Sequence, residues 1–501
     1  MQLDYKRLRN ITLFYIVLPI IIFFIGWLKW HWAILLTVLY MFATYCVCKD
    51  GSDPDTIILS KSAVIGIILV AVIWCFIAGQ GGYFSQSDDF NYRNAIFRDM
   101  ITLKWPVMYP KSNTAMVYYI GHWMVPALIG KVAMLFADKN VGWVFGNFAL
   151  FLWTTIGIIL VILFIIKAVK VQKTKTIIMV ALIFVFFSGL DIIGIIFQSI
   201  ANRRLIIVNH LEWWATLAQY SSISTCLFWS FNQAVVPWLI ILLYINKENV
   251  RNYAFLGFSC LLYAPLPFIG IVPYFIGRAF LDFVNACRKK EVSFYLKQIY
   301  SKQNIIALFT LLPVMYLFYY SNSAINSAGV QINNNSPWGI AKTIAVIALF
   351  IALEFAFYAI IIYYDNKKNL DYYICVILLF IILFFKIGSA NDFTMRVSIP
   401  SVMMLMILVI KSLLQAEHNL LIHIRNPIRR YKTTILVVLL LIGAFTPATE
   451  FIRATSTVIE HGKFGIVADD IKTLSGQPIE NISNFVTEEP LHKKFFIYFA
   501  K

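Results

Sequence analysis

The chain has 501 residues, of which 60% are hydrophobic and only 13% are charged, and its mean hydropathy is +0.76. Soluble domains carry about 25% charged residues, so the composition excludes an ordinary soluble protein and indicates a helical protein with many membrane spans. The formal net charge of +17 follows from 42 Lys and Arg against 25 Asp and Glu. In a membrane protein such an excess is explained by basic cytoplasmic loops, without any nucleic acid partner.

Apolar stretches separated by basic loops predict the path of the first half of the chain. The basic residues near the start place the amino terminus in the cytoplasm. Spans are expected at residues 11–28, 30–47, 62–80, 141–166, 177–199 and 221–244. The basic loop 167–175 then requires residues 81–140 to begin and end outside. Within this first large external loop, residues 116–136 contain a proline and a lysine, which favours an interfacial or re-entrant helix over a crossing.

The second half continues the alternation. Residues 253–277 lie between two basic loops, and their three prolines predict a short broken hairpin. Further spans are expected at residues 303–320, 338–364, 371–385, 397–413 and 433–447. The prediction is an all-α polytopic membrane protein with about 12 to 14 transmembrane helices. Residues 1–447 form its membrane domain, and residues 448–501 form a small segment outside, for which an α/β fold is expected.

Polar residues that are not typical of ordinary loops collect at the predicted external ends of the spans. They are Asp88, Asp89, Tyr92, Arg93, His122, Asp191, Arg203, Arg204, His210, Glu212, Gln219, Asp392 and Arg396. Ionisable groups at membrane depth are costly and tend to line functional cavities. Carboxylates and guanidinium groups at one face therefore indicate a site that handles an anionic group and moves a proton.

Nine of these residues also have a structural explanation. The alternatives are helix capping for Asp88 and Asp89, packing against an arginine for Asp191, lipid headgroup contacts for Arg203 and Arg204, an interfacial belt for Glu212 beside Trp213 and Trp214, snorkelling for Arg396, and ordinary structural roles for His122 and His210. The sequence contains no HExxH, paired CxxC or P-loop motif, so neither a zinc site nor nucleotide hydrolysis is indicated.

The chain resembles the bacterial GT-C glycosyltransferases, polytopic enzymes that use lipid-phosphate sugars as donors. The resemblance lies in an acidic motif in the first large external loop, broken middle spans and a small external carboxyl-terminal part. Four segments carry it: SDDFNYRNAIFRDMITLKWPV, SGLDIIG, QYSSISTCLFWSFNQAVVPW and NDFTMR. The chain departs from the family plan because residues 11–47 form two spans before the span that leads into the acidic loop.

The resemblance implies an enzyme that transfers a sugar, with inversion, from a polyprenyl-phosphate donor to a cell-envelope acceptor. The acceptor would be a glycan, teichoic acid, lipid or protein at the outer face of a bacterial plasma membrane. The implied roles are catalysis for Asp88, Asp89 and Asp191, lipid-phosphate binding for Arg93, Arg203, Arg204 and Arg396, and sugar or acceptor binding for Glu212, Gln219, Tyr92, His122 and Asp392. A divalent cation, Mg²⁺ or Mn²⁺, at Asp88 and Asp89 is compatible with the family, although nothing in the sequence requires it.

Three other functions stay open. A polysaccharide polymerase acting on lipid-linked repeat units would also need arginines at the outer face. A transporter or lipid flippase would need charged groups that continue through the membrane centre. A scaffold for envelope synthesis would need no catalytic acid.

Overall fold

The computed structural model describes residues 2–50, 56–206, 210–324, 331–332, 339–386, 391–417, 427–462, 464 and 473–501. Within these ranges, eight helices are long and apolar enough to cross a membrane, or nine when the bent pair Ile223–Gln233 and Val235–Ile245 counts as one span. The chain is thus an all-α, multi-pass membrane protein, as predicted. The expected 12 to 14 crossings stay a prediction, because four further apolar helices are shorter than 18 residues.

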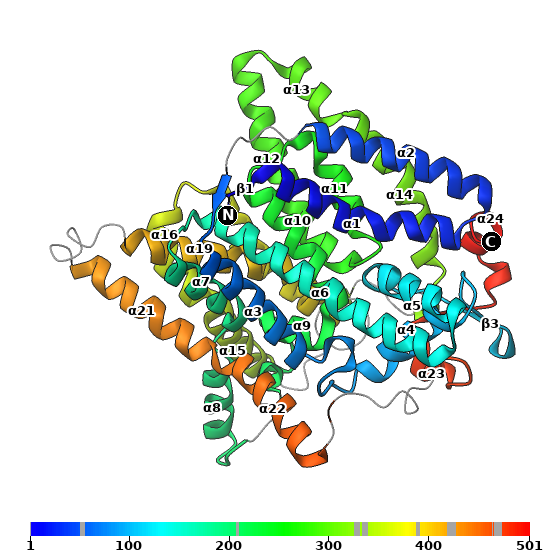
Figure 1. Ribbon diagram of the computed structural model, residues 1–501. Helices are drawn as coiled ribbons and strands as arrows, with labels where there is room; N and C mark the ends of the chain where they lie inside the picture. The colour runs from blue at the N-terminus through cyan, green and yellow to red at the C-terminus, as the bar shows by residue number, and fades with distance from the viewer. Residues whose placement is uncertain are drawn as a thin grey trace.

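The first part of the chain forms a bundle of long helices (Figure 1). They are α1 (Tyr5–Trp27), α2 (Trp30–Lys49), α3 (Lys61–Ile77), α5 (Met124–Phe136), α6 (Lys139–Val169), α7 (Thr174–Phe186), α8 (Asp191–Ala201), α9 (Ile223–Ser230) and α10 (Val235–Ile245). Helix α6 begins where the Asp138 carboxylate accepts hydrogen bonds from two backbone N–H groups. It packs against α5 where Gly130 faces Gly142, and a Cβ on Gly130 would come within 2.7 Å of the Gly142 carbonyl. Small residues thus allow these two helices to approach closely.

The second part adds the remaining helices to the bundle. They are α11 (Tyr253–Cys260), α12 (Pro265–Lys289), α13 (Val292–Ile299), α14 (Lys302–Tyr320), α15 (Ile340–Ile351), α16 (Phe357–Asn366), α17 (Leu370–Ile381), α18 (Asp392–Val397), α19 (Ile399–Glu417), α21 (Pro427–Gly443) and α22 (Phe445–His461). The segment expected as a broken hairpin forms α11 and the first half of α12, which continues unbroken to Lys289. Residues Tyr431–His461 qualify together as one 31-residue candidate span.

Three spans are interrupted inside the bundle. The helical path breaks at residues 187–190 between α7 and α8, and a π-helix, η8 (Ala352–Ala356), separates α15 from α16. The 3-10 turn η5 (Phe231–Gln233) joins α9 to α10 at a bend of 106°. Irregular backbone at membrane depth is tolerated where it is packed in protein or lines a cavity. These interruptions bring polar side chains into the bundle.

Short strands and small helices close the two ends of the bundle. The strands are β1 (Gln2–Asp4), β2 (Thr56–Ile58), β3 (Met108–Tyr109), β4 (Thr114–Met116), β5 (Gln331–Ile332), β6 (Phe385–Lys386) and β7 (Val486–Glu488). All pair antiparallel: β1 with β2, β5 with β6, and β3, β4 and β7 in that order. The small helices are α4 (Phe90–Thr102), α23 (Ile479–Ile482), α24 (Lys494–Tyr498), η1 (Gln80–Gly82), η2 (Pro110–Ser112), η3 (Gly121–Trp123), η4 (Leu211–Ala215), η6 (Val250–Asn252), η9 (Ile382–Phe384) and η11 (Pro490–His492).

The carboxyl-terminal residues pack on the first large loop. Strand β7 pairs with β4 so that Ala115 lies opposite Thr487. Figure 1 places the carboxyl terminus at the end of α1, where the Lys501 N–H donates to the Trp27 carbonyl at 3.0 Å. Residues 473–501 and the loop that follows α3 thus share one end of the bundle, which we call the loop end.

The opposite end carries the amino terminus and the basic loops, and we call it the basic end. There the Arg9 guanidinium makes two hydrogen bonds to the Glu248 carboxylate, at 2.6 and 2.8 Å, and both side chains are buried. Arg251 pairs with Asp50 at 3.3 Å. The two ends therefore differ in composition, because lysines and arginines of the loops 167–175, 246–252 and 288–302 lie away from the loop end.

Candidate functional site

The two aspartates at the start of α4 are exposed at the loop end. Asp89 occupies the cap position but its carboxylate makes no capping hydrogen bond, so the capping explanation does not hold for it. Instead it accepts from Arg93, one turn later, at 2.9 Å. Within the described residues, the Asp88 carboxylate has no ion pair or hydrogen bond. The Arg93 side chain is buried, lies over the Phe90 ring at 5.7 Å, and has no partner for its Nη1 in the described part of the chain.

Helix α18 repeats this arrangement. The Asp392 side chain is 40% exposed and accepts from Arg396, one turn later, at 3.1 Å. The Arg396 guanidinium is buried and its Nη1, too, has no partner among the described residues. Burial lowers the pKa of Arg396, but the nearby Asp392 carboxylate and other groups outweigh this, so its pKa is raised and it stays charged. Each pair therefore presents an exposed acid and a buried arginine with one free donor.

A row of aromatic rings joins the two pairs. In order from Arg93 toward Arg396, the rings are Phe90, Phe231, Trp123, Tyr118 and Tyr119, with neighbouring centroids 4.5 to 6.2 Å apart. Burial raises the pKa of Tyr119, and the charges of Arg396 and Asp392 also influence this pKa. Tyr119 therefore lies beside the Asp392–Arg396 pair. Tyr92 stacks on Phe485 of the carboxyl-terminal tail. No ion pair joins Asp88 or Asp89 to Arg396 within the described ranges.

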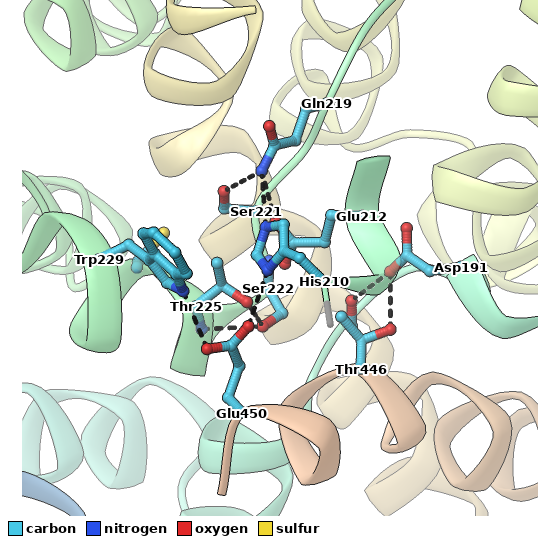
Figure 2. A network of polar contacts seen from close by, with 12 residues as sticks. Asp191, His210, Glu212, Gln219, Ser221, Ser222, Thr225, Trp229, Thr446 and Glu450 are labelled. Carbon is cyan, nitrogen blue, oxygen red and sulfur yellow. Dashed lines mark hydrogen bonds and ion pairs between the residues drawn. The ribbon is translucent and has the colours of Figure 1, made fainter. Parts of the chain in front are cut away.

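A second polar cluster, which we call the buried network, lies around His210 (Figure 2). The His210 Nδ1 is 2.9 Å from the Glu450 carboxylate of α22, and its Nε2 is 3.5 Å from the Glu212 carboxylate. Gln219 donates to Glu212 at 2.8 Å, and the Ser222 N–H donates to it at 2.7 Å. All these side chains are buried. The network therefore ties the loop before α9 to α22.

The charges within this network balance. Burial lowers the pKa of His210, but Glu212 and Glu450 on either side outweigh it and raise the pKa to about 9. Burial raises the pKa of Glu212, but His210 and hydrogen bonds outweigh it, so this pKa is lowered. Glu450 also accepts from Arg453, whose guanidinium lies 4.6 Å from the Trp229 ring centroid. At neutral pH, His210 is thus a cation held between two carboxylates.

Asp191 begins α8 at the break after α7 and is buried. Its carboxylate accepts from Ser188 at 3.1 Å and from Thr446 of α22 at 2.8 Å. The Glu354 carboxyl of the π-helix lies beside Asp191 and accepts from the Trp214 indole N–H at 3.4 Å. The expected alternative of an arginine partner is not what the structure shows for Asp191.

The remaining predicted residues lie apart from these clusters. Arg203 and Arg204 are exposed after α8, as a headgroup contact would require, and no ion pair holds them within the described ranges. His122 is buried, with its Nε2 2.9 Å from the Thr154 hydroxyl and its Nδ1 unpartnered there. Sequence reasoning missed Glu354 and Glu450. A single glutamate within the apolar run 344–363 was the available signal for Glu354, and none existed for Glu450.

The divalent cation at Asp88 and Asp89 stays a prediction. The two acids offer two carboxylates, of which Asp89 is already bound to Arg93. In the described part of the chain, no group of three or more His, Cys, Asp or Glu side chains has a geometry that could hold a metal. The donor set thus does not fit a dedicated metal site, and no reaction step below depends on one.

Comparisons of the chain with protein-family models, with curated proteins and with solved structures found no match. The chemistry of the site is therefore argued from its own residues. Exposed carboxylates can accept a proton, and buried arginines with free donors can bind an anion.

Proposed function

We propose that this protein is a membrane glycosyltransferase that moves a sugar from a polyprenyl-phosphate donor to an acceptor of the bacterial cell envelope. The observation that carries the proposal is the repeated pair at the loop end: an exposed aspartate next to a buried arginine that keeps a free Nη1. A buried guanidinium with an unfilled donor favours a phosphate ligand, because its planar fork binds two oxygen atoms at once.

The proposal assigns different roles to the two acids of the first loop. Asp88 is exposed and unpaired within the described residues, so it is the candidate base that removes the proton of the acceptor hydroxyl. The hydroxyl oxygen then attacks the anomeric carbon, and the bond to the lipid phosphate breaks with inversion. Arg396 receives the negative charge of the departing phosphate. Asp89 holds Arg93 in place.

An apolar groove supports a lipid-linked donor. It has a volume of about 640 Å³ and runs between α7 and α21, from Thr174 to Ala444. Ala444 is two residues from Thr446, which bonds to Asp191. A polyprenyl chain is wholly apolar, so it can pack along such a groove through van der Waals contacts within the bilayer.

Orientation follows from the basic end. Lys and Arg collect in cytoplasmic loops, so we place the amino terminus inside and the loop end with the carboxyl terminus outside, at the plasma membrane. A donor assembled inside would reach the site after it has been flipped. This placement matches the absence of any nucleotide-binding motif in the sequence.

The test measures transfer by purified protein in lipid nanodiscs. The donor is a radiolabelled polyprenyl-phosphate hexose, the acceptor is isolated cell envelope, and several hexoses are tried. We expect Asp88→Asn to lower the rate about 10²- to 10⁴-fold, because the base is lost. The control is Asp138→Asn, an exposed acid in the same loop whose capping role asparagine can fill. A wild-type rate in folded Asp88→Asn protein would overturn the assignment.

A second candidate function is proton-coupled transport or lipid flipping. The observation that favours it is the carboxyl pair of Asp191 and Glu354, which lies at two interruptions of the helical bundle. Transporters place ionisable groups at such breaks. This candidate gains support if proteoliposomes flip a fluorescent polyprenyl-phosphate hexose without sugar transfer, and if Glu354→Gln stops flipping while Asp88→Asn does not.

A further inference from the structure

The corner of the broken span between α9 and α10 contains buried amides without partners. Asn232 and Gln233 are at most 1% exposed, and both the nitrogen and the oxygen of each amide lack a hydrogen bond within the described residues. Leaving such groups unpaired in the interior lowers the stability of the folded protein. Native proteins rarely keep this cost without a function or a bound molecule.

Two more buried polar groups approach the same corner. Gln80 of η1 donates to the Leu227 carbonyl of α9 at 3.0 Å, while its side-chain oxygen has no partner in the described ranges. The His122 ring of η3 contacts the Phe231 ring at 5.3 Å and leaves its Nδ1 unpartnered there. Three segments far apart in sequence therefore carry unpaired polar atoms, and two of them contact residues 227 and 231, which lead into the bend.

The corner lies directly below the strip that carries the candidate base. Phe90, which follows Asp89, stacks on Phe231 at 5.5 Å. The Ser87 hydroxyl donates to the Phe228 carbonyl at 3.4 Å. Residues 85–89 are half-buried or exposed. The strip that contacts the segment before the corner therefore also carries the loop-end aspartates, and a ligand group would have to displace this strip to reach the buried amides.

The chemistry of the unfilled atoms indicates which ligand group fits. An amide offers both donors and acceptors without charge, and a sugar hydroxyl likewise both donates and accepts. A phosphate would instead favour a cation, and the nearby Arg93 lies over the Phe90 ring, on the side of the loop-end aspartate Asp89, and makes no hydrogen bond to the amides within the described residues. Aromatic rings beside a few convergent polar groups are typical of small-molecule sites, and Phe90, Trp123 and Phe231 provide such rings here.

We propose that Asn232 and Gln233, together with Gln80 and His122, form the subsite that binds the hydroxyl groups of the transferred sugar. This inference rests on the proposed function, because it identifies where that function's donor sugar is held. Arg396 would recognise the phosphate and the amide corner would recognise the sugar.

The experiment separates the two parts of the donor by using two probes. Binding to full-length protein in nanodiscs is measured for farnesyl phosphate and for farnesyl-phosphoryl glucose, galactose and mannose. In the wild type we expect the best sugar to tighten binding at least about tenfold over farnesyl phosphate alone. In Asn232→Leu and in Gln233→Met we expect the sugar to add no affinity, so that the two probes bind equally well (a ratio of about 1). Binding of farnesyl phosphate itself should be unchanged.

Stability provides a second readout. Removing unpaired buried amides should leave the melting temperature unchanged or raise it. The control Asn366→Leu removes a buried amide that donates to Ile362 at the basic end, and it should lower the melting temperature without changing the sugar gain. If Asn232→Leu does not fold, Gln233→Met alone tests the subsite, because methionine nearly preserves the shape of the glutamine side chain.

The outcomes distinguish the two proposals. If the wild type binds neither probe, the proposed function fails. If it binds farnesyl phosphate and no hexose improves the affinity, or if both variants keep the sugar gain, the subsite assignment fails. A lower melting temperature with an intact sugar gain would show that the amides hold internal water.

Discussion

At the scale of single residues, His210 shows how burial and charge decide a protonation state. Its ring lies between Glu212 and Glu450, and these carboxylates raise its pKa from the usual 6.5 to about 9 despite burial. A group whose pKa is raised on folding stabilises the folded state fully below its unfolded pKa. The stabilisation is lost as the pH rises through the folded pKa.

The thermal stability of the protein should therefore fall between pH 6.5 and pH 9. The shift corresponds to on the order of 3 kcal/mol. We expect His210→Gln to lower the melting temperature at pH 6 and to flatten its decline toward pH 9, as measured by thermal unfolding in detergent. His492→Gln, at an exposed position of the tail, should leave the wild-type pH profile intact. A His210→Gln profile parallel to that of the wild type would contradict the assignment.

At the scale of elements, the carboxyl-terminal tail is bound to the helices of the bundle. Strand β7 adds to the sheet of the first loop, and α24 inserts Phe495 between Phe23 of α1 and Phe318 of α14. Phe495 is completely buried. Strand β4 of the first large loop and strand β7 of the tail belong to one sheet, so the tail holds in place the loop that carries Asp88.

Phe495→Ala should destabilise the protein by about 3–5 kcal/mol, because it leaves a cavity at the end of α1. Thermal unfolding of the purified protein measures this loss. Leu491→Ala, on the same tail but 72% exposed, should change stability by less than about 0.5 kcal/mol. Equal effects of the two substitutions would show that the tail does not pack on α1.

The three interruptions act at this same scale. Each places a polar group where a regular helix would have buried only apolar side chains: Asp191 after the break, Glu354 in the π-helix and Asn232 at the bend. Neighbouring segments supply hydrogen bonds to Asp191 and Glu354 that a membrane cannot, whereas the Asn232 amide has no partner within the described residues.

At the scale of the whole molecule, the chain separates two chemically different ends. The basic end holds the amino terminus and ion pairs such as Arg9 with Glu248. The loop end holds the aspartate–arginine pairs, the buried network and the carboxyl terminus. An enzyme that takes its donor from the outer leaflet needs this polarity.

Cysteine labelling in intact cells tests the orientation. Cys287 is exposed on α12 near the basic end, so a membrane-impermeant maleimide should label it only after permeabilisation. Leu491→Cys in a Cys287→Ser background should be labelled without permeabilisation. Labelling with the opposite accessibility would reverse the proposed orientation.

The sequence by itself determined the class of the protein and most of the helical segments. Hydropathy is a local property, so apolar stretches such as 11–28 and 141–166 correspond closely to α1 and α6. Their position at the predicted external ends of spans also marked Arg93 and Arg396, and the structure shows that each pairs with an aspartate one turn away.

The tertiary structure alone decided which polar groups meet. His210 and Glu450 are 240 residues apart, and Asp191 bonds to Thr446 of a distant helix. Such contacts depend on how helices pack, and one amphipathic or apolar segment does not encode its neighbours. The sequence also could not reveal that the amides at the bend are unpaired. Whether a buried amide lacks a hydrogen bond is known only when the positions of all its possible partners are known.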